Sequence, residues 1–164
     1  MQLFEGFSPD SKIWIYQCNR PFTAEEIISI SDSCKRFTDS WKAHEHQLKA
    51  SSTILYNRFI IFCVDENTAG ASGCSIDKSV HLIREIEKQY QVFLLNRMQV
   101  AYMENDQVSA CPLNMFLKMY ENEEVNAQTL VFDNTITTLA ELNSKWIQPV
   151  KSTWMNNKLP VLRK

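Results

Sequence analysis

The sequence predicts an α+β protein built as a ferredoxin-like β-α-β-β-α-β sandwich. A β-branched and aromatic run at 12–18 is typical of a strand, and two later segments carry apolar residues at helical spacing. Two further strand-like runs lie between those segments, which completes the order of a split β-α-β unit. We expect the sandwich to span residues 1–97 and residues 98–164 to form a smaller α+β module packed on it.

The first helix is expected to begin after Thr23, because Glu26 stands three residues later and completes a capping box. Ser75 is the expected cap of the second helix. The strand-like runs 49–56 and 58–65 predict a hairpin with its turn at Tyr56-Asn57, and the run 93–103 predicts the last strand. The apolar stripes of the two helices are Ile27, Ile30, Cys34, Phe37 and Trp41, then Ile76, Val80, Ile83, Ile86 and Tyr90.

The last third predicts a hairpin over 98–111, a short helix opened by Pro112, a strand at 129–132 and a helix at 139–146. Tyr102, Pro112, Val125 and the strand 129–132 make the segment 102–132 resemble a GYF-type module. Such modules bind proline-rich peptides through aromatic residues. This sequence lacks the Gly-Tyr-Phe triplet and has Cys111 where a glycine is expected, so the resemblance implies the scaffold alone.

Composition excludes several classes of function. The chain of 164 residues is 45% hydrophobic with a net charge of -2, which argues against a nucleic-acid binder. No apolar run approaches the roughly 20 residues of a membrane-spanning helix, and the N-terminus does not have the pattern of a signal peptide. The five cysteines form no C-x-x-C pair, which is typical of reduced thiols, so we expect a cytoplasmic protein.

The stretches 43–50, 56–59 and 69–79 resemble a family of short bacterial proteins of no assigned activity, sometimes labelled ABC-transporter ATPase. A phosphate-binding loop of such an ATPase requires G-x-x-x-x-G-K-[ST]. Counting from Gly70, the second glycine falls at Ser75 and the lysine at Ile76, whereas Lys78-Ser79 comes two residues late. The sequence therefore argues against the ATPase label.

The predicted hairpin register brings polar residues together at the open end of the hairpin, which we call the rim. With Lys49 facing Val64, His44 and His46 are expected beside Asp65, and the following loop leads through Cys74 into the second helix. Cys74 could act as a nucleophile, with His44 or His46 as base and Asp65 beside them. Alternatively, His44, His46 and Asp65 could hold a divalent metal. A third hypothesis is an anion site made by Lys49, Ser72, Gly73, Ser75 and Lys78 at the helix N-terminus.

Ordinary roles compete with all three hypotheses, since the same residues can cap a helix, form a turn or face solvent. The convergence of polar groups without a complete catalytic signature favours a non-enzymatic binding module at the His44/Asp65/Cys74 rim. Its partner would be another protein or a small anionic ligand. The alternative is a small thiol- or metal-dependent enzyme that uses the same residues. Open sheet edges also make a homodimer plausible.

Overall fold

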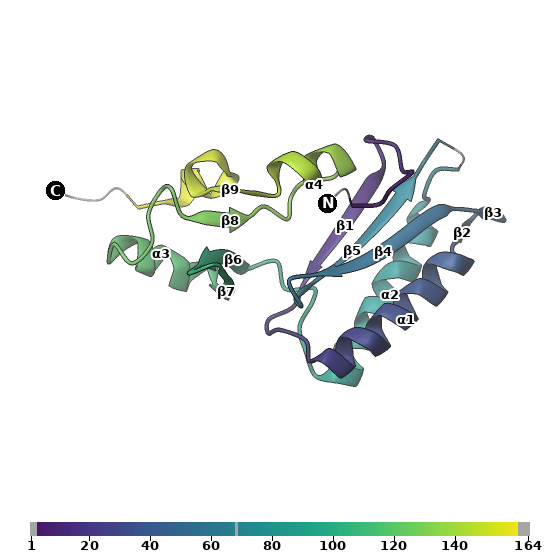
Figure 1. The fold of residues 1–164 in the computed structure, drawn as a ribbon, viewed down its shortest axis with the longest axis horizontal. Helices are drawn as coiled ribbons and strands as arrows, with labels where there is room; N and C mark the ends of the chain where they lie inside the picture. Colours follow the sequence, from purple (N-terminus) through teal and green to yellow (C-terminus); the bar gives the residue numbers. More distant parts are fainter. Residues whose placement is uncertain (1–2, 68, 161–164) are drawn as a thin grey trace.

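Successive apolar residues at 59–64 are typical of a strand that is covered on both faces. The computed structural model, which describes residues 3–67 and 69–160, places this run as β5 (Phe59–Asp65), in which all seven residues are buried. It lies in the middle of an antiparallel sheet with the order β1-β5-β4, between β1 (Lys12–Gln17) and β4 (Lys49–Leu55). The protein is therefore α+β with antiparallel sheets (Figure 1).

Helices α1 (Ala24–Ser40) and α2 (Gly73–Tyr90) cover one face of this sheet (Figure 1). The capping box of Thr23 and Glu26 at the start of α1 is confirmed. Helix α2 begins earlier than predicted, because Ser72 is its cap. Ser75 occupies the third helical position, and its hydroxyl accepts from the Ser72 N–H at 2.7 Å.

The hairpin of β4 and β5 is present, but its register differs from the prediction by one residue. Lys49 faces Asp65 and Leu55 faces Phe59, so three residues form the turn instead of two. The backbone of Tyr56 and Asn57 is left-handed, and the Arg58 N–H closes the turn on the Leu55 carbonyl at 3.0 Å. A shift of one residue moves every side chain of a strand to the opposite face, so the predicted rim loses its basis.

A second correction concerns the histidines, which do not extend β4. They belong to a separate small hairpin made of β2 (Lys42–Ala43) and β3 (His46–Gln47). His44 and Glu45 form its two-residue turn with φ of 48° and 67°, the left-handed backbone that such a turn requires. The Leu48 N–H then donates to the Trp41 carbonyl at 2.9 Å, which closes the hairpin before β4 begins.

The last third forms a second antiparallel sheet with the order β7-β6-β8-β9. Its strands are β6 (Gln99–Glu104), β7 (Gln107–Pro112), β8 (Leu130–Phe132) and β9 (Ile147–Pro149). The helices of this part are α3 (Leu113–Glu121), α4 (Leu139–Lys145) and the short 3-10 helices η1 (Val150–Ser152) and η2 (Trp154–Lys158).

The four-stranded sheet of a ferredoxin-like sandwich is not formed within the described chain. In that fold the strand after α2 pairs with β1, whereas here β6 pairs with β7 along six residues and with β8 at Tyr102. A tight hairpin closes a short loop, which favours the β7 partner over the distant β1 edge. The segment around Thr137 and Thr138 contacts the Lys12 end of the β1 edge instead.

The two faces of the first sheet belong to different apolar cores. Trp14, Tyr16 and Phe62 pack under the helices, whereas Ile13 and Ile61 pack against the last third of the chain through Phe132, Leu139, Leu142 and Trp146. A third core lies between the second sheet and α3. The last third thus covers the face that the helices leave open. Among the described residues, no helix has the length and apolar character needed to cross a membrane.

Candidate functional site

Asp65, which the sequence placed at the predicted rim, is committed to structural contacts. Its Oδ2 lies 2.9 Å from the Lys49 Nζ and accepts from the Ser8 N–H, while its Oδ1 accepts from the Asn67 N–H. The hydrogen bond from Lys49 holds the pKa of Asp65 below its ordinary value, with help from the Asn67 N–H. Lys49 also donates to the Gly6 carbonyl at 2.6 Å. The Lys49–Asp65 pair therefore holds the segment around Gly6 and Ser8 against the β4–β5 hairpin.

The structure does not join the histidines to this pair. His44 and His46 are exposed on the β2–β3 hairpin, and in the part of the chain that is described no hydrogen bond or ion pair links them to Asp65 or Cys74. No three His, Cys, Asp or Glu side chains among the residues described could hold a metal ion, so His44, His46 and Asp65 do not form the predicted metal site.

The start of α2 is brought close to the β2 hairpin, since the Trp41 indole donates to the Ser75 carbonyl at 2.9 Å. Ser72 and Ser75 satisfy each other's backbone amides, so the predicted anion ligands already serve as caps. Gly73 is the first helical residue, and Lys78 lies one turn further along the exposed surface. Cys74 is exposed in the first turn, whereas the other four cysteines are buried.

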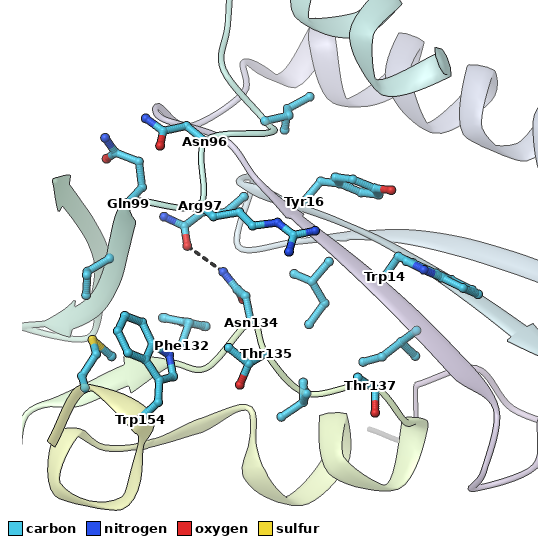
Figure 2. Close-up of a pocket in the computed structure, with 17 residues that line it drawn as sticks. Trp14, Tyr16, Asn96, Arg97, Gln99, Phe132, Asn134, Thr135, Thr137 and Trp154 are labelled. Carbon is cyan, nitrogen blue, oxygen red and sulfur yellow. Dashed lines mark hydrogen bonds between the residues drawn. The ribbon is translucent and has the colours of Figure 1, made fainter. Parts of the chain in front are cut away.

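A cleft that sequence reasoning missed lies at the outer edge of β1. It has a volume of about 390 Å³, which is within the range of small-ligand sites. Five consecutive residues, 13–17, line the cleft, although their side chains point alternately to the two faces of the sheet. What these residues have in common is the backbone edge of β1, so that edge forms one wall of the cleft. The opposite wall comes from the last third of the chain and includes Phe132, Asn134 and Trp154 (Figure 2).

The direction in which successive backbone groups of β1 point shows that part of its outer edge is open. The Cys18 N–H donates to the Arg58 carbonyl, on the side of β5. The Ile13 N–H points to the opposite side and donates to the Thr137 carbonyl at 3.0 Å. Because the two sides alternate along an antiparallel strand, the N–H and C=O groups of Ile15 and Gln17 also face outward. Within residues 3–67 and 69–160, no hydrogen bond occupies these four groups.

Polar side chains converge on the same stretch of β1. The Asn134 amide donates to the Gln17 Oε1 at 2.8 Å, the bond drawn in Figure 2, and the Asn134 Oδ1 accepts from the Trp146 indole at 3.0 Å. Gln17 is 6% exposed, and its Nε2 finds no partner among the residues described. A buried amide nitrogen without a partner is unusual in a folded protein and marks a position where a ligand acceptor would be favourable.

Among the described residues that line the cleft, Arg97 is the only charged one. Figure 2 shows its side chain extending from the linker between α2 and β6 toward β1, between Tyr16 and Asn134. Within the described chain it makes no ion pair or side-chain hydrogen bond. Burial raises the pKa of the Tyr16 phenol, while the Ser79 hydroxyl and the nearby positive charge of Arg97 oppose that shift.

Comparison with family models, curated proteins and solved structures finds no match for this chain. In the sequence, the only sign of this cleft is that Trp14, Tyr16 and Gln17 lie in one short strand. Whether that strand lines a cleft depends on whether another strand pairs with its outer edge, which the sequence does not show.

Proposed function

We propose that this protein is a non-enzymatic binding module whose cleft between β1 and the last third of the chain takes a ligand with an apolar body and one anionic group. The observation that carries the proposal is the Arg97 guanidinium, which extends into a cleft lined by no carboxylate among the residues described. Arginine binds carboxylate, phosphate or sulfonate oxygens through paired N–H donors.

The remaining lining residues match such a ligand. Phe132, Ile136 and Trp154 offer apolar surface, while Asn96, Gln99 and Asn134 offer amides that fix orientation. Apolar walls with a few convergent polar groups are characteristic of ligand sites. Nothing in this set pairs a nucleophile with a base, which supports binding over catalysis.

Anilinonaphthalene sulfonate, a fluorescent aromatic sulfonate, tests the proposal, with the uncharged phenylnaphthylamine as the matched probe. The native protein should bind the sulfonate at one saturable site, and R97M should weaken that binding about tenfold, which is the usual effect of losing one charge-assisted hydrogen bond. Binding of the uncharged probe should stay unchanged in R97M. R84M, which removes an exposed arginine of α2, is the control. Equal sulfonate affinity in R97M and the native protein would contradict the proposal.

A thiol-dependent enzyme is the second candidate function. It rests on Cys74, the exposed cysteine in the first turn of α2, whose thiol is open to a reactant. No histidine is hydrogen-bonded to it in the described part of the chain. The pH profile of alkylation tests this candidate, since a midpoint at the value for free cysteine, about 8.5, would remove it.

We also propose a cytoplasmic location for the protein and a relationship to two known families. Five unpaired cysteines support a reducing cytoplasm. The order β6–β7, α3, β8 supports the expected relation to GYF-type modules, and the short bacterial family sometimes labelled ABC-transporter ATPase stays the proposed relative.

A further inference from the structure

Three features of the cleft, as seen in the described part of the chain, together indicate the chemistry of its ligand. They are an open strand edge, a guanidinium without a partner near that edge, and a neighbouring segment that leaves the edge partway along. Arg97 carries the charge, and Ile15 and Gln17 carry the free backbone groups. We propose, building on the function proposed above, that the ligand is an extended peptide that pairs with β1 and places its C-terminal carboxylate on Arg97.

The outer edge of β1 carries backbone groups without partners among the described residues. Backbone N–H and C=O groups of an exposed edge are a template for another strand, and proteins usually cover such edges or block them with charged residues. Lys12 is the only charged residue of β1, and it lies at the end already contacted by Thr138. Trp14 through Gln17 therefore present no charge that would repel an added strand.

The segment 134–138 pairs with β1 along only part of its length. It runs antiparallel to β1, since the Asn134 side chain reaches Gln17 at one end and Thr138 pairs with Lys12 at the other. Only the Lys12 end makes backbone contacts, with the Ile13 N–H as the last bonded group. The segment therefore lies beside the free stretch of β1 without pairing with its backbone. The free stretch from Trp14 to Gln17 matches a peptide of about four residues at roughly 3.3 Å per residue.

Charge complementarity favours a carboxylate at one end of the cleft. Figure 2 shows Arg97 lying across the Tyr16 end of the cleft, opposite the end blocked by Thr137. A peptide that pairs with Ile15 and Gln17 would bring one of its ends to this guanidinium. A free C-terminal carboxylate matches the paired N–H donors of arginine, and a C-terminal amide does not.

The test uses pools of acetylated pentapeptides with Val, Ile, Thr or Tyr at each position, one pool ending in a carboxylate and the other in an amide. We expect the carboxylate pool to slow the hydrogen exchange of the Ile15 and Gln17 amides about tenfold or more, because strand pairing protects both N–H groups. The amide pool should bind about tenfold more weakly, and R97M should abolish the difference between the two pools.

Backbone pairing is tested separately with I15P. This change removes an N–H that β5 does not use, and proline is tolerated at outward positions of edge strands. I15A removes the same side chain but keeps the N–H, so it should retain peptide binding while I15P loses it. Pools N-methylated at alternate residues give the same test from the side of the ligand and do not depend on the folding of a variant.

The outcomes separate the two proposals. Sulfonate binding that depends on Arg97, together with unchanged exchange at Ile15 and Gln17 in the carboxylate pool, would overturn the peptide inference and leave the proposed function standing. Equal protection by the carboxylate and amide pools would also overturn it, because the carboxylate would then have no partner. If neither the sulfonate probe nor the peptides bind, both proposals fail.

Discussion

The side-chain amide of Asn134 bridges two distant parts of the chain, donating to Gln17 of β1 at 2.8 Å and accepting from the Trp146 indole at 3.0 Å. This bridge ties the last third of the protein to the strand edge that lines the cleft. It also orients the Gln17 amide through its oxygen, while the amide nitrogen has no partner among the described residues.

We expect N134A to lower the free energy of unfolding by about 2 kcal/mol, because the buried side chains of Gln17 and Trp146 would lose their hydrogen-bond partner. Urea unfolding followed by tryptophan fluorescence measures the change. The matched control is Q99A, which alters another amide of the cleft that makes no side-chain hydrogen bond in the described chain; its effect should stay within about 0.5 kcal/mol. Equal stability of N134A and the native protein would show that the bridge contributes nothing.

The acid dependence of stability should include a contribution from Glu26. Its carboxylate accepts two hydrogen bonds from the Arg20 guanidinium, both at 2.8 Å, and one from the Thr23 N–H. These contacts lower the pKa of Glu26 from 4.5 to about 2. A lowered pKa in the folded state means that the stabilisation is complete above pH 4.5 and is lost as the pH falls toward 2.

E26Q should therefore cost about 1 kcal/mol at pH 7, a figure kept small because Arg20 is partly exposed to solvent. The difference in the free energy of unfolding between E26Q and the native protein should shrink as the pH falls toward the folded-state pKa of Glu26. Chemical unfolding at a series of pH values measures it, with E25Q, an exposed neighbour in the same helical turn, as the control. A difference that is constant with pH would contradict the assignment.

The β2–β3 turn should tolerate replacement of its histidine. His44 and Glu45 both hold left-handed backbone, which Asn and Gly adopt at lower cost. The double variant H44N/E45G should raise the free energy of unfolding by about 1 kcal/mol. Thermal and urea unfolding measure the change, and E45A, which keeps the strained position, should give no gain. A loss of stability in the double variant would indicate that the His44 side chain makes a contact of its own.

The five cysteines should differ sharply in reactivity. Burial raises the pKa of both Cys34 and Cys63 to about 12, and Cys18 and Cys111 are also buried. Because the thiolate is the reactive form and Cys74 is exposed, one thiol per native chain should react rapidly with a chromogenic disulfide at pH 8. All five should react in denaturant, and C74S should have no fast phase. Rapid reaction of two or more native thiols would contradict the burial of the other four.

Local features of the sequence determined most of the individual elements. The capping box of Thr23 and Glu26, the apolar stripes of both helices and the uninterrupted apolar run of β5 each act within a few residues of chain, so they can be recognised without knowing the fold. The polar turn between β6 and β7 also acts locally. These signals gave the α+β class and the order of the longer elements, but not the short strands β2, β3 and β9.

Only the tertiary structure decided how these elements combine. The turn at Tyr56 to Arg58 shifted the β5 register, and left-handed backbone at His44 and Glu45 diverted the histidines away from β4. Strand β6 joined β7 instead of β1, which left the edge at Ile15 and Gln17 open beside Arg97. Strand pairing depends on competition among edges that lie far apart in the chain, so no single stretch of sequence carries the information that places this cleft.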